Sequence, residues 1–274
     1  LNTSFQSNGG FTSKLFGKKF GGTFGIMYNR SFRNLDLLNR ANVIDENTYE
    51  VSIVSSYNDR KYQQEISAGA LGSVSLQLNS FNKISVKSIL NINSSNSVSQ
   101  RNGEDFSRQD QLKGSEFTFK QNTFFTVQAN GEHRLIKPLT FKWYGAFNIL
   151  DGHIPDQRRI LYSKEAGTQH PYRLLISNTL SQQSGSRIYQ SLSDYIYTAG
   201  GDLSYKFKWL EQNQTLKGGY MLQVKDRLYD AKLFANYLPL DNDALRLLPA
   251  DQIFLPENFG DGTANKFAFD AIKG

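Results

Sequence analysis

The chain alternates apolar and polar residues over long segments. Between residues 19 and 33 the even positions include Phe20, Phe24 and Tyr28, whereas the odd positions are mostly small or polar. A period of two over about a dozen residues indicates a long β-strand with one apolar face. The alternation recurs and predicts about eight strands, at residues of about 3–15, 19–33, 62–78, 83–93, 116–134, 140–150, 194–207 and 215–228.

The connections between these strands are expected to alternate between short and long. Long extracellular loops are predicted at about 33–61, 94–115, 151–193 and 229–274. Outer-membrane barrels have short periplasmic turns and long extracellular loops, whereas soluble sandwiches carry a turn signal every 8–12 residues or so. The pattern therefore predicts an all-β protein, a transmembrane antiparallel β-barrel.

Aromatic residues on the apolar face are expected to form two girdles. One set lies near the short turns: Phe20, Phe141, Trp143, Phe207 and Trp209. The other lies near the long loops: Tyr28, Phe32, Phe117, Phe119, Tyr195 and Tyr197. From Tyr197 to Phe207 a tilted strand rises about 25 Å, the height of the apolar band of such barrels. The alternative is that these rings belong to the core of a soluble β protein.

Composition adds to this picture. Of 274 residues none is cysteine, 39% are hydrophobic, 13% are aromatic, and the net charge is +6. Disulfides, zinc-thiolate sites and iron–sulfur clusters are thereby excluded. The low hydrophobic fraction fits a barrel that faces lipid on one side and a polar lumen on the other. Eight strands cannot enclose a wide lumen, so we expect a segment of a larger barrel, or else a complete small one.

Several motifs, in order, resemble those of one family. They are Phe20–Phe32, ending in Tyr-Asn-Arg-Ser-Phe; Gly69–Leu71 followed by Lys83–Lys87; Ile154–Arg159; Leu216–Tyr220 with Lys225–Phe234; and Leu248–Gly260. Together they resemble the TonB-dependent outer-membrane receptors in the form common in the Bacteroidetes. The resemblance covers most of the chain and corresponds to the N-terminal part of the barrel, without its plug.

The resemblance implies a 22-strand barrel in a Gram-negative outer membrane, closed around an N-terminal plug. Such receptors import a large scarce nutrient, namely a siderophore, cobalamin, a glycan or a peptide. The implied partners are outer-membrane lipid and lipopolysaccharide, the TonB–ExbB–ExbD complex acting through the plug, and a surface lipoprotein. Two other functions remain open: a passive structural or adhesive barrel, and a barrel subunit of a larger envelope complex.

The chain offers little for catalysis or cofactor binding. Its three histidines, His133, His153 and His170, are dispersed, whereas a metal site needs three or four converging ligands. Neither a Gly-x-Ser-x-Gly elbow nor a P-loop occurs. We therefore expect no enzymatic activity, cofactor or metal. No nucleic-acid partner is expected either, because the basic residues are dispersed.

Two charged groups are candidate ligand-binding sites, with the residues Asp156, Arg158, Arg159, Asp226, Arg227 and Asp230. The first group, Asp156, Arg158 and Arg159, belongs to a basic loop that also holds Lys164, Arg173 and Arg187. The basic residues of this loop either attract anions or form ordinary ion pairs with Asp151, Asp156 and Glu165. The second, with Lys225 and Lys232, either binds a ligand or forms cross-strand pairs in the barrel wall. Four residues are expected to face the lumen: Asn122, Gln128, Tyr144 and Asn148.

Overall fold

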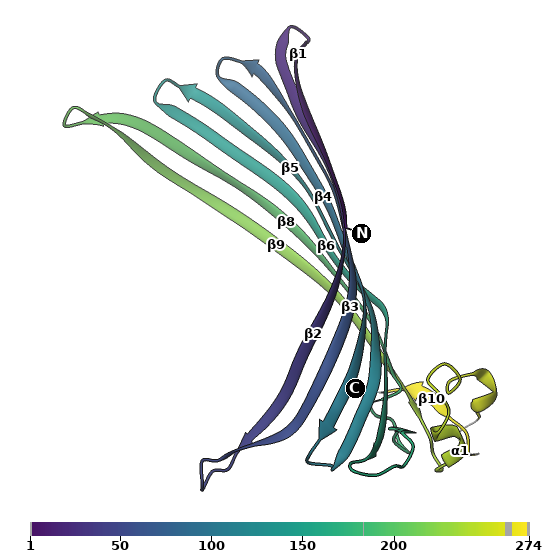
Figure 1. The fold of residues 1–274 in the computed structure, drawn as a ribbon. Helices are drawn as coiled ribbons and strands as arrows, with labels where there is room; N and C mark the ends of the chain where they lie inside the picture. Colours follow the sequence, from purple (N-terminus) through teal and green to yellow (C-terminus); the bar gives the residue numbers. More distant parts are fainter. Residues whose placement is uncertain (1, 183, 261–264, 273–274) are drawn as a thin grey trace.

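A computed structural model describes residues 2–182, 184–260 and 265–272, which form one curved antiparallel sheet of ten strands (Figure 1). The long strands are β1 (Thr3–Leu15), β2 (Lys18–Ile44), β3 (Val51–Asn79), β4 (Asn82–Asp105), β5 (Asp110–Ile136), β6 (Leu139–Glu165), β8 (Ser186–Trp209) and β9 (Gln212–Tyr237). The short elements are β7 (Arg173–Leu174), β10 (Ala268–Ala271), the helix α1 (Asp243–Arg246) and the 3₁₀ helix η1 (Pro256–Asn258).

The sheet follows the order of the chain, from β1 to β6 and then β8, β9 and β10, with β7 beside β6. The eight predicted strands are confirmed as the eight long ones, and the all-β antiparallel class is confirmed. The sheet does not close on itself over the described residues. No helix in the described part of the chain is long and apolar enough to cross a membrane.

At one end of the sheet, two-residue turns join successive strands. These turns are at residues 16–17, 80–81, 137–138 and 210–211. In the first and last, Phe16, Gly17, Leu210 and Glu211 all have positive φ. Two residues of positive φ form the turn that matches the twist of the flanking strands, so these hairpins have a fixed register.

The long loops expected at 33–61 and 94–115 are wrong. β2 and β3 continue to a turn at residues 45–50, and β4 and β5 continue to a turn at residues 106–109. Backbone pairing extends through these segments without interruption except for a shift at Ala41 and Asn42. The alternation that marks a strand in the sequence requires one apolar face, and here polar residues occupy both faces.

The other two expected loops are shorter than predicted. β6 extends to Glu165 and β8 begins at Ser186, so the loop at 151–193 shrinks to residues 166–185, which include β7. β9 extends to Tyr237, and residues 238–260 and 265–267 form a folded segment with α1 and η1. Positions 183, 261–264 and 273–274 of these expected loops lie outside the described residues.

The register joins the apolar positions of all long strands into one face. One row, with each residue opposite the next, runs Gly9, Phe24, Gly72, Ser88, Val127, Phe147, Tyr197 and Val224. The neighbouring row on the other face runs Thr23, Ser73, Lys87, Gln128, Ala146, Thr198 and Gln223. Residues directly opposite share a face, so we name these the apolar face and the polar face.

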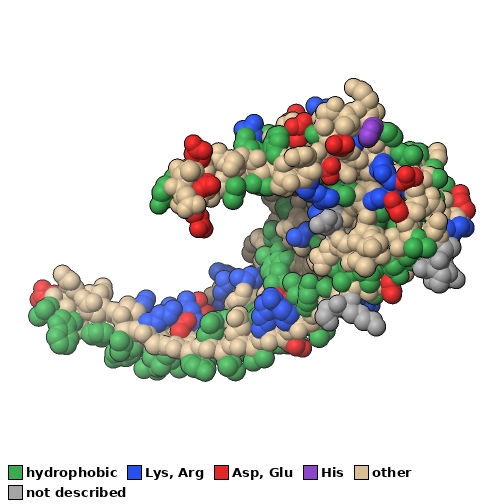
Figure 2. All heavy atoms as spheres, turned by 90° about the horizontal axis from the view of Figure 1, so that it is seen from below, with side chains coloured by type: hydrophobic (Ala, Val, Ile, Leu, Met, Phe, Trp, Pro, Cys, Tyr) green, Lys and Arg blue, Asp and Glu red, His purple; other side chains and the backbone are tan. Residues whose placement is uncertain are grey.

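The apolar face is the convex one. Figure 2 shows hydrophobic side chains along the outside of one arm of the curved sheet and Lys and Arg side chains along its inside. The eleven residues of the two aromatic sets share the apolar face: Phe20, Tyr28, Phe32, Phe117, Phe119, Phe141, Trp143, Tyr195, Tyr197, Phe207 and Trp209. The four residues expected to face the lumen, Asn122, Gln128, Tyr144 and Asn148, lie on the polar face.

A small apolar core lies at the end of the sheet opposite the two-residue turns. It packs Ile160 and Tyr162 of β6 and Leu174 of β7 against the folded segment after β9, which contributes Leu238, Ile253 and Phe267. The side chains of Leu174, Ile253 and Phe267 are fully buried. Figure 1 shows this segment, in yellow, beside the lower end of the sheet. The core therefore fixes the loop end of β6 and β9.

Candidate functional site

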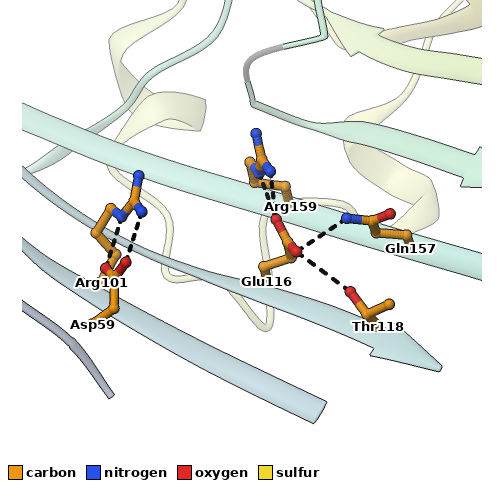
Figure 3. Close-up of polar contacts among 6 residues, drawn as sticks. All are labelled: Asp59, Arg101, Glu116, Thr118, Gln157 and Arg159. Atoms are coloured by element: carbon orange, nitrogen blue, oxygen red, sulfur yellow. Dashed lines mark hydrogen bonds and ion pairs between the residues drawn. The ribbon is translucent and has the colours of Figure 1, made fainter. Parts of the chain in front are cut away.

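The polar face carries a ladder of ion pairs beyond the aromatic sets, at the end away from the two-residue turns (Figure 3). Asp59 of β3 is directly opposite Arg101 of β4. The guanidinium donates two hydrogen bonds to the carboxylate, from Nε at 2.8 Å and from Nη2 at 2.7 Å. This hydrogen bonding raises the pKa of Arg101 above its usual range. The Tyr57 ring lies 4.6 Å from the same guanidinium and helps to hold it in place.

Glu116 of β5 forms the second step of the ladder. Arg159 of β6, directly opposite, donates from Nε at 2.8 Å and from Nη2 at 2.5 Å to one carboxylate oxygen. The other oxygen accepts from Gln157 Nε2 at 3.0 Å and from Thr118 Oγ1 at 3.4 Å. Each oxygen of the Glu116 carboxylate therefore accepts two hydrogen bonds from side chains of β5 and β6, and these bonds fix its orientation.

A polar cavity of about 260 Å³ lies between the two steps. It is lined by Asp59, Ser99, Arg101, Ser115, Glu116, Arg159 and Leu161. Its charged groups of both signs are already paired with one another, and the Ser99 hydroxyl on the same face adds a further donor and acceptor for a polar ligand. The cavity faces the concave side of the sheet.

A second charged group lies on the apolar face, above its aromatic residues. Asp156 of β6 accepts two hydrogen bonds from Arg187 of β8, at 3.0 and 2.6 Å, and pairs with Arg158 at 3.2 Å. The bond to Asp156 raises the pKa of Arg187. Beside this group a cavity of about 660 Å³ separates β5, β6 and β8 from the folded segment after β9, and Phe254 and Phe269 line it.

A third group lies on the polar face between β8 and β9. Asp194 accepts from Arg227 Nε at 2.6 Å and Nη2 at 2.8 Å, and from Lys225 Nζ at 2.8 Å. Its side chain is only 4% exposed. Two cations therefore converge on one nearly buried carboxylate.

Candidate residues that are neighbours in the sequence lie on opposite faces of the sheet in the structure. Arg158 and Arg159 lie on opposite faces, since consecutive residues of a strand alternate. Asp226 and Asp230 lie on the apolar face, whereas Arg227 lies on the polar face, so these three form no single site. Asp230 instead pairs with Lys232 of its own strand at 3.5 Å.

The basic loop residues have partners, and Asp156 is the one expected carboxylate that the ion pairs of the described residues include. Arg158 and Arg187 share Asp156, and Lys164 donates to the Thr168 carbonyl at 3.1 Å. Arg159 and Arg173 pair with carboxylates that were not expected: Glu116 for the former and Asp241 and Asp243 for the latter.

Sequence reasoning missed four residues that the ion pairs require, namely Asp59, Arg101, Glu116 and Asp194. Asp59 and Arg101 lie in segments expected to be loops, whereas Glu116 and Asp194 are the first residues of two predicted strands. Within the described ranges, no three His, Asp or Glu side chains gather into a potential metal site.

Comparison of the chain with protein-family models, with curated proteins and with solved structures found no match. The assignment of function therefore depends on the geometry of the sheet and on the motifs of the sequence.

Proposed function

We propose that this chain forms part of the wall of a TonB-dependent outer-membrane receptor that imports a large scarce nutrient, namely a siderophore, cobalamin, a glycan or a peptide. One observation carries the proposal: the register joins apolar residues of all eight long strands into one convex face, opposite a polar concave face. A transmembrane barrel needs this division, because its outside contacts lipid and its inside contacts water or a plug.

The exposure of the apolar face favours lipid over water. Phe24 and Leu222 are 55% exposed and Tyr220 is 77% exposed, although all three belong to the apolar face. Monomeric soluble proteins rarely present a continuous apolar patch beyond about 300–600 Å². A bilayer would cover these side chains, with the two aromatic sets at its interfaces.

The remaining parts of the proposal come from the ordered motifs. The polar face would surround the plug through which TonB, ExbB and ExbD act, and lipopolysaccharide would surround the convex face. The ladder of Asp59, Arg101, Glu116 and Arg159 would lie in the extracellular part of the lumen, where an arriving solute meets the wall. The proposed role is binding and transport, with no chemical reaction.

A pair of adjacent substitutions tests the membrane location. Leu222 lies on the apolar face and Met221, which is 57% exposed, lies on the polar face of the same strand. Leu222→Arg should cost about 1–3 kcal/mol of membrane stability, because Leu222 is opposite Ala199, between the aromatic set of Tyr197 and the bilayer midplane, and the cost of a lipid-facing cation falls from the midplane toward the interface. Met221→Arg should cost much less. The measurement is denaturant unfolding of the protein in lipid vesicles, with detergent-phase partitioning as the first readout.

Two results would contradict the proposal. Partition of the unsubstituted protein into the aqueous phase would exclude the membrane location. A stable open conductance in planar bilayers, from protein purified from outer membranes, would favour a passive pore over plugged import.

A further inference from the structure

The convex face carries a cavity on the opposite side of the sheet from the ion-pair ladder. Its volume is about 660 Å³, within the range of about 300–1,000 Å³ that small-molecule sites occupy. From the sheet it is lined by Phe117, Arg158 and Arg187, each directly opposite the next. From the folded segment it is lined by Phe254 and Phe259, among others. The cavity therefore lies between the outside of the sheet and the folded segment, and the proposed function leaves it without a role.

The walls of this cavity are held in place by hydrogen bonds and packing. Gly185 N donates to the Arg159 carbonyl at 2.9 Å, and the Gly185 carbonyl accepts from Asn236 N at 3.0 Å and from Nδ2 at 2.9 Å. The centre of the Phe254 ring lies 5.3 Å from that of Phe267, which is fully buried in the apolar core. Both sides of the cavity are therefore formed before a ligand arrives, as is usual for small-molecule sites.

The two arginines of the cavity share a single carboxylate. Arg158 is directly opposite Arg187, and like charges in that position repel each other. Asp156 accepts from Nε and Nη2 of Arg187 and lies 3.2 Å from Nε of Arg158. Nη1 of Arg187 and both Nη atoms of Arg158 have no hydrogen-bond acceptor among the described residues. This group therefore retains one positive charge and several free N–H donors.

We propose that the cavity binds an anionic amphiphile, with a phosphate or carboxylate group bridging Arg158 and Arg187 and an apolar body against phenylalanine rings. A guanidinium presents its N–H groups in a planar fork that suits either anion. The rings that line the cavity are Phe117, Phe254, Phe259 and Phe269.

Both halves of such a ligand are needed. A small anion would leave the phenylalanine rings uncovered, and a neutral hydrocarbon would leave the arginine donors unpaired. The proposed solute path follows the polar face, so this is a second site. It requires the cavity only, whether or not the rest of the convex face contacts lipid.

Asp251 allows the sign of the ligand charge to be tested. It lines the same cavity, is exposed and has no ion pair among the described residues. Its carboxylate repels an anion held at the arginines, so removing its charge should strengthen binding, whereas removing an arginine should weaken it.

The probe is dodecyl phosphate, titrated onto the purified chain in a nonionic polyoxyethylene detergent, with bound molecules counted by native mass spectrometry. Arg158→Gln should weaken binding about tenfold, since it removes one cation and leaves the pair of Asp156 and Arg187 in place. Arg30→Gln is the matched control, because Arg30 lies on the same face but outside the cavity, and it should change the affinity less than about twofold. Asp251→Asn should strengthen binding about threefold.

A two-chain membrane lipid and a single-chain amphiphile share the proposed chemistry, and a competition experiment distinguishes them. Phosphatidylglycerol that displaces dodecyl phosphate would assign the cavity to a membrane lipid. Phosphatidylglycerol that fails to displace it would assign the cavity to a single-chain amphiphile. Either result supports the site.

Four results would overturn the proposal. Equal losses from Arg158→Gln and Arg30→Gln would show non-specific attraction to the convex face. Inorganic phosphate that competes as well as dodecyl phosphate would indicate a small-anion site. Weaker binding by Asp251→Asn would contradict an anionic ligand. A lower urea midpoint that accompanies the loss of binding in Arg158→Gln would assign this arginine a structural role.

Because binding is measured in detergent, its failure is distinct from failure of the membrane proposal. A chain that binds dodecyl phosphate but does not enter vesicles would support the cavity site alone. A chain that enters vesicles but binds no dodecyl phosphate would overturn the cavity site alone.

Discussion

The indole N–H of Trp143 donates a hydrogen bond to Nε2 of His133, at 3.0 Å across the apolar face. The other ring nitrogen of His133, Nδ1, lies 2.7 Å from Asn82 Oδ1, so the imidazole bridges β4 to β6. Trp143 covers Gly131 of β5, and a Cβ at that position would collide with the indole and with His133. The glycine is thus required by the aromatic ring above it.

Gly131→Ala should therefore displace Trp143 from its hydrogen bond and cost about 1–3 kcal/mol, the usual cost of overpacking. Gly145→Ala is the control, because no atom lies within 4 Å of the position that its Cβ would take. In a Trp209→Phe background the emission of the remaining tryptophan reports the displacement. An unchanged emission spectrum and an unchanged unfolding midpoint in Gly131→Ala would contradict this packing.

Asp194 is expected to hold the strand pair β8 and β9 together through Arg227 and Lys225. Asp194→Ala leaves both cations without their shared carboxylate and should lower the urea midpoint. Asp226→Ala, one position from Arg227 but on the apolar face, should stay within about 0.5 kcal/mol, as exposed substitutions usually do. Equal effects of the two substitutions would show that the pairing contributes nothing to stability.

Tyr162 should make stability depend on pH at high values. Burial raises the pKa of its phenol to about 12, and the nearby charge of Asp251 adds to the increase. Its hydroxyl donates to the Leu248 carbonyl at 2.9 Å. Since the folded pKa lies above the unfolded value of about 10, the stabilisation is complete below about pH 10 and is lost as pH rises toward 12.

Tyr162→Phe keeps the buried ring and removes the titrating group. It should cost about 0.5–1.5 kcal/mol at neutral pH, the net value of one hydrogen bond, and should flatten the loss of stability above pH 10. Unfolding midpoints measured from about pH 8 to 12 give both effects. The same slope in both proteins would assign the high-pH loss to other groups.

The apolar core at the loop end should unfold separately from the sheet. Phe267→Ala removes a fully buried ring and should cost about 3–5 kcal/mol, mostly in the segment after β9. Leu240→Ala, at a site 53% exposed, serves as the control. Hydrogen exchange should then rise in residues 238–260 of the Phe267 variant while β2 to β5 stay protected, and a uniform rise would show that the two parts unfold together.

The strands were predictable where one face is apolar. β1 was predicted at residues 3–15 and is observed at Thr3–Leu15, and all eight long strands were found. The extensions of β2 to β6, β8 and β9 were missed, because polar and apolar residues are mixed on both faces there, as at Leu37 and Leu38, and period two disappears from the sequence. Backbone hydrogen bonds maintain the strand regardless of side chains, and no composition signal reports them.

The ion pairs could be predicted only with the register. Asp59 faces Arg101, Glu116 faces Arg159, and Asp194 faces Arg227, each as a directly opposed pair. The turn at residues 80–81 alone would place Asp59 opposite Asn102, and the register shift between Gln77 and Asn79 brings it opposite Arg101 instead. The face of the sheet on which Arg158 lies was also hard to predict, because the register between β5 and β6 shifts between Phe117 and Gln121. Such a shift changes which positions share a face.

The order of the strands in the sheet, which follows the order of the chain, has a consequence for assembly. Each long strand after β1 is hydrogen-bonded to the long strand that precedes it in the chain, so every hairpin can form as soon as its own residues are present. A completed hairpin then offers its last strand as the template for the next, and the sheet grows in one direction without rearranging earlier contacts. A break in a single hairpin would therefore separate the sheet into two parts that each retain their own pairing.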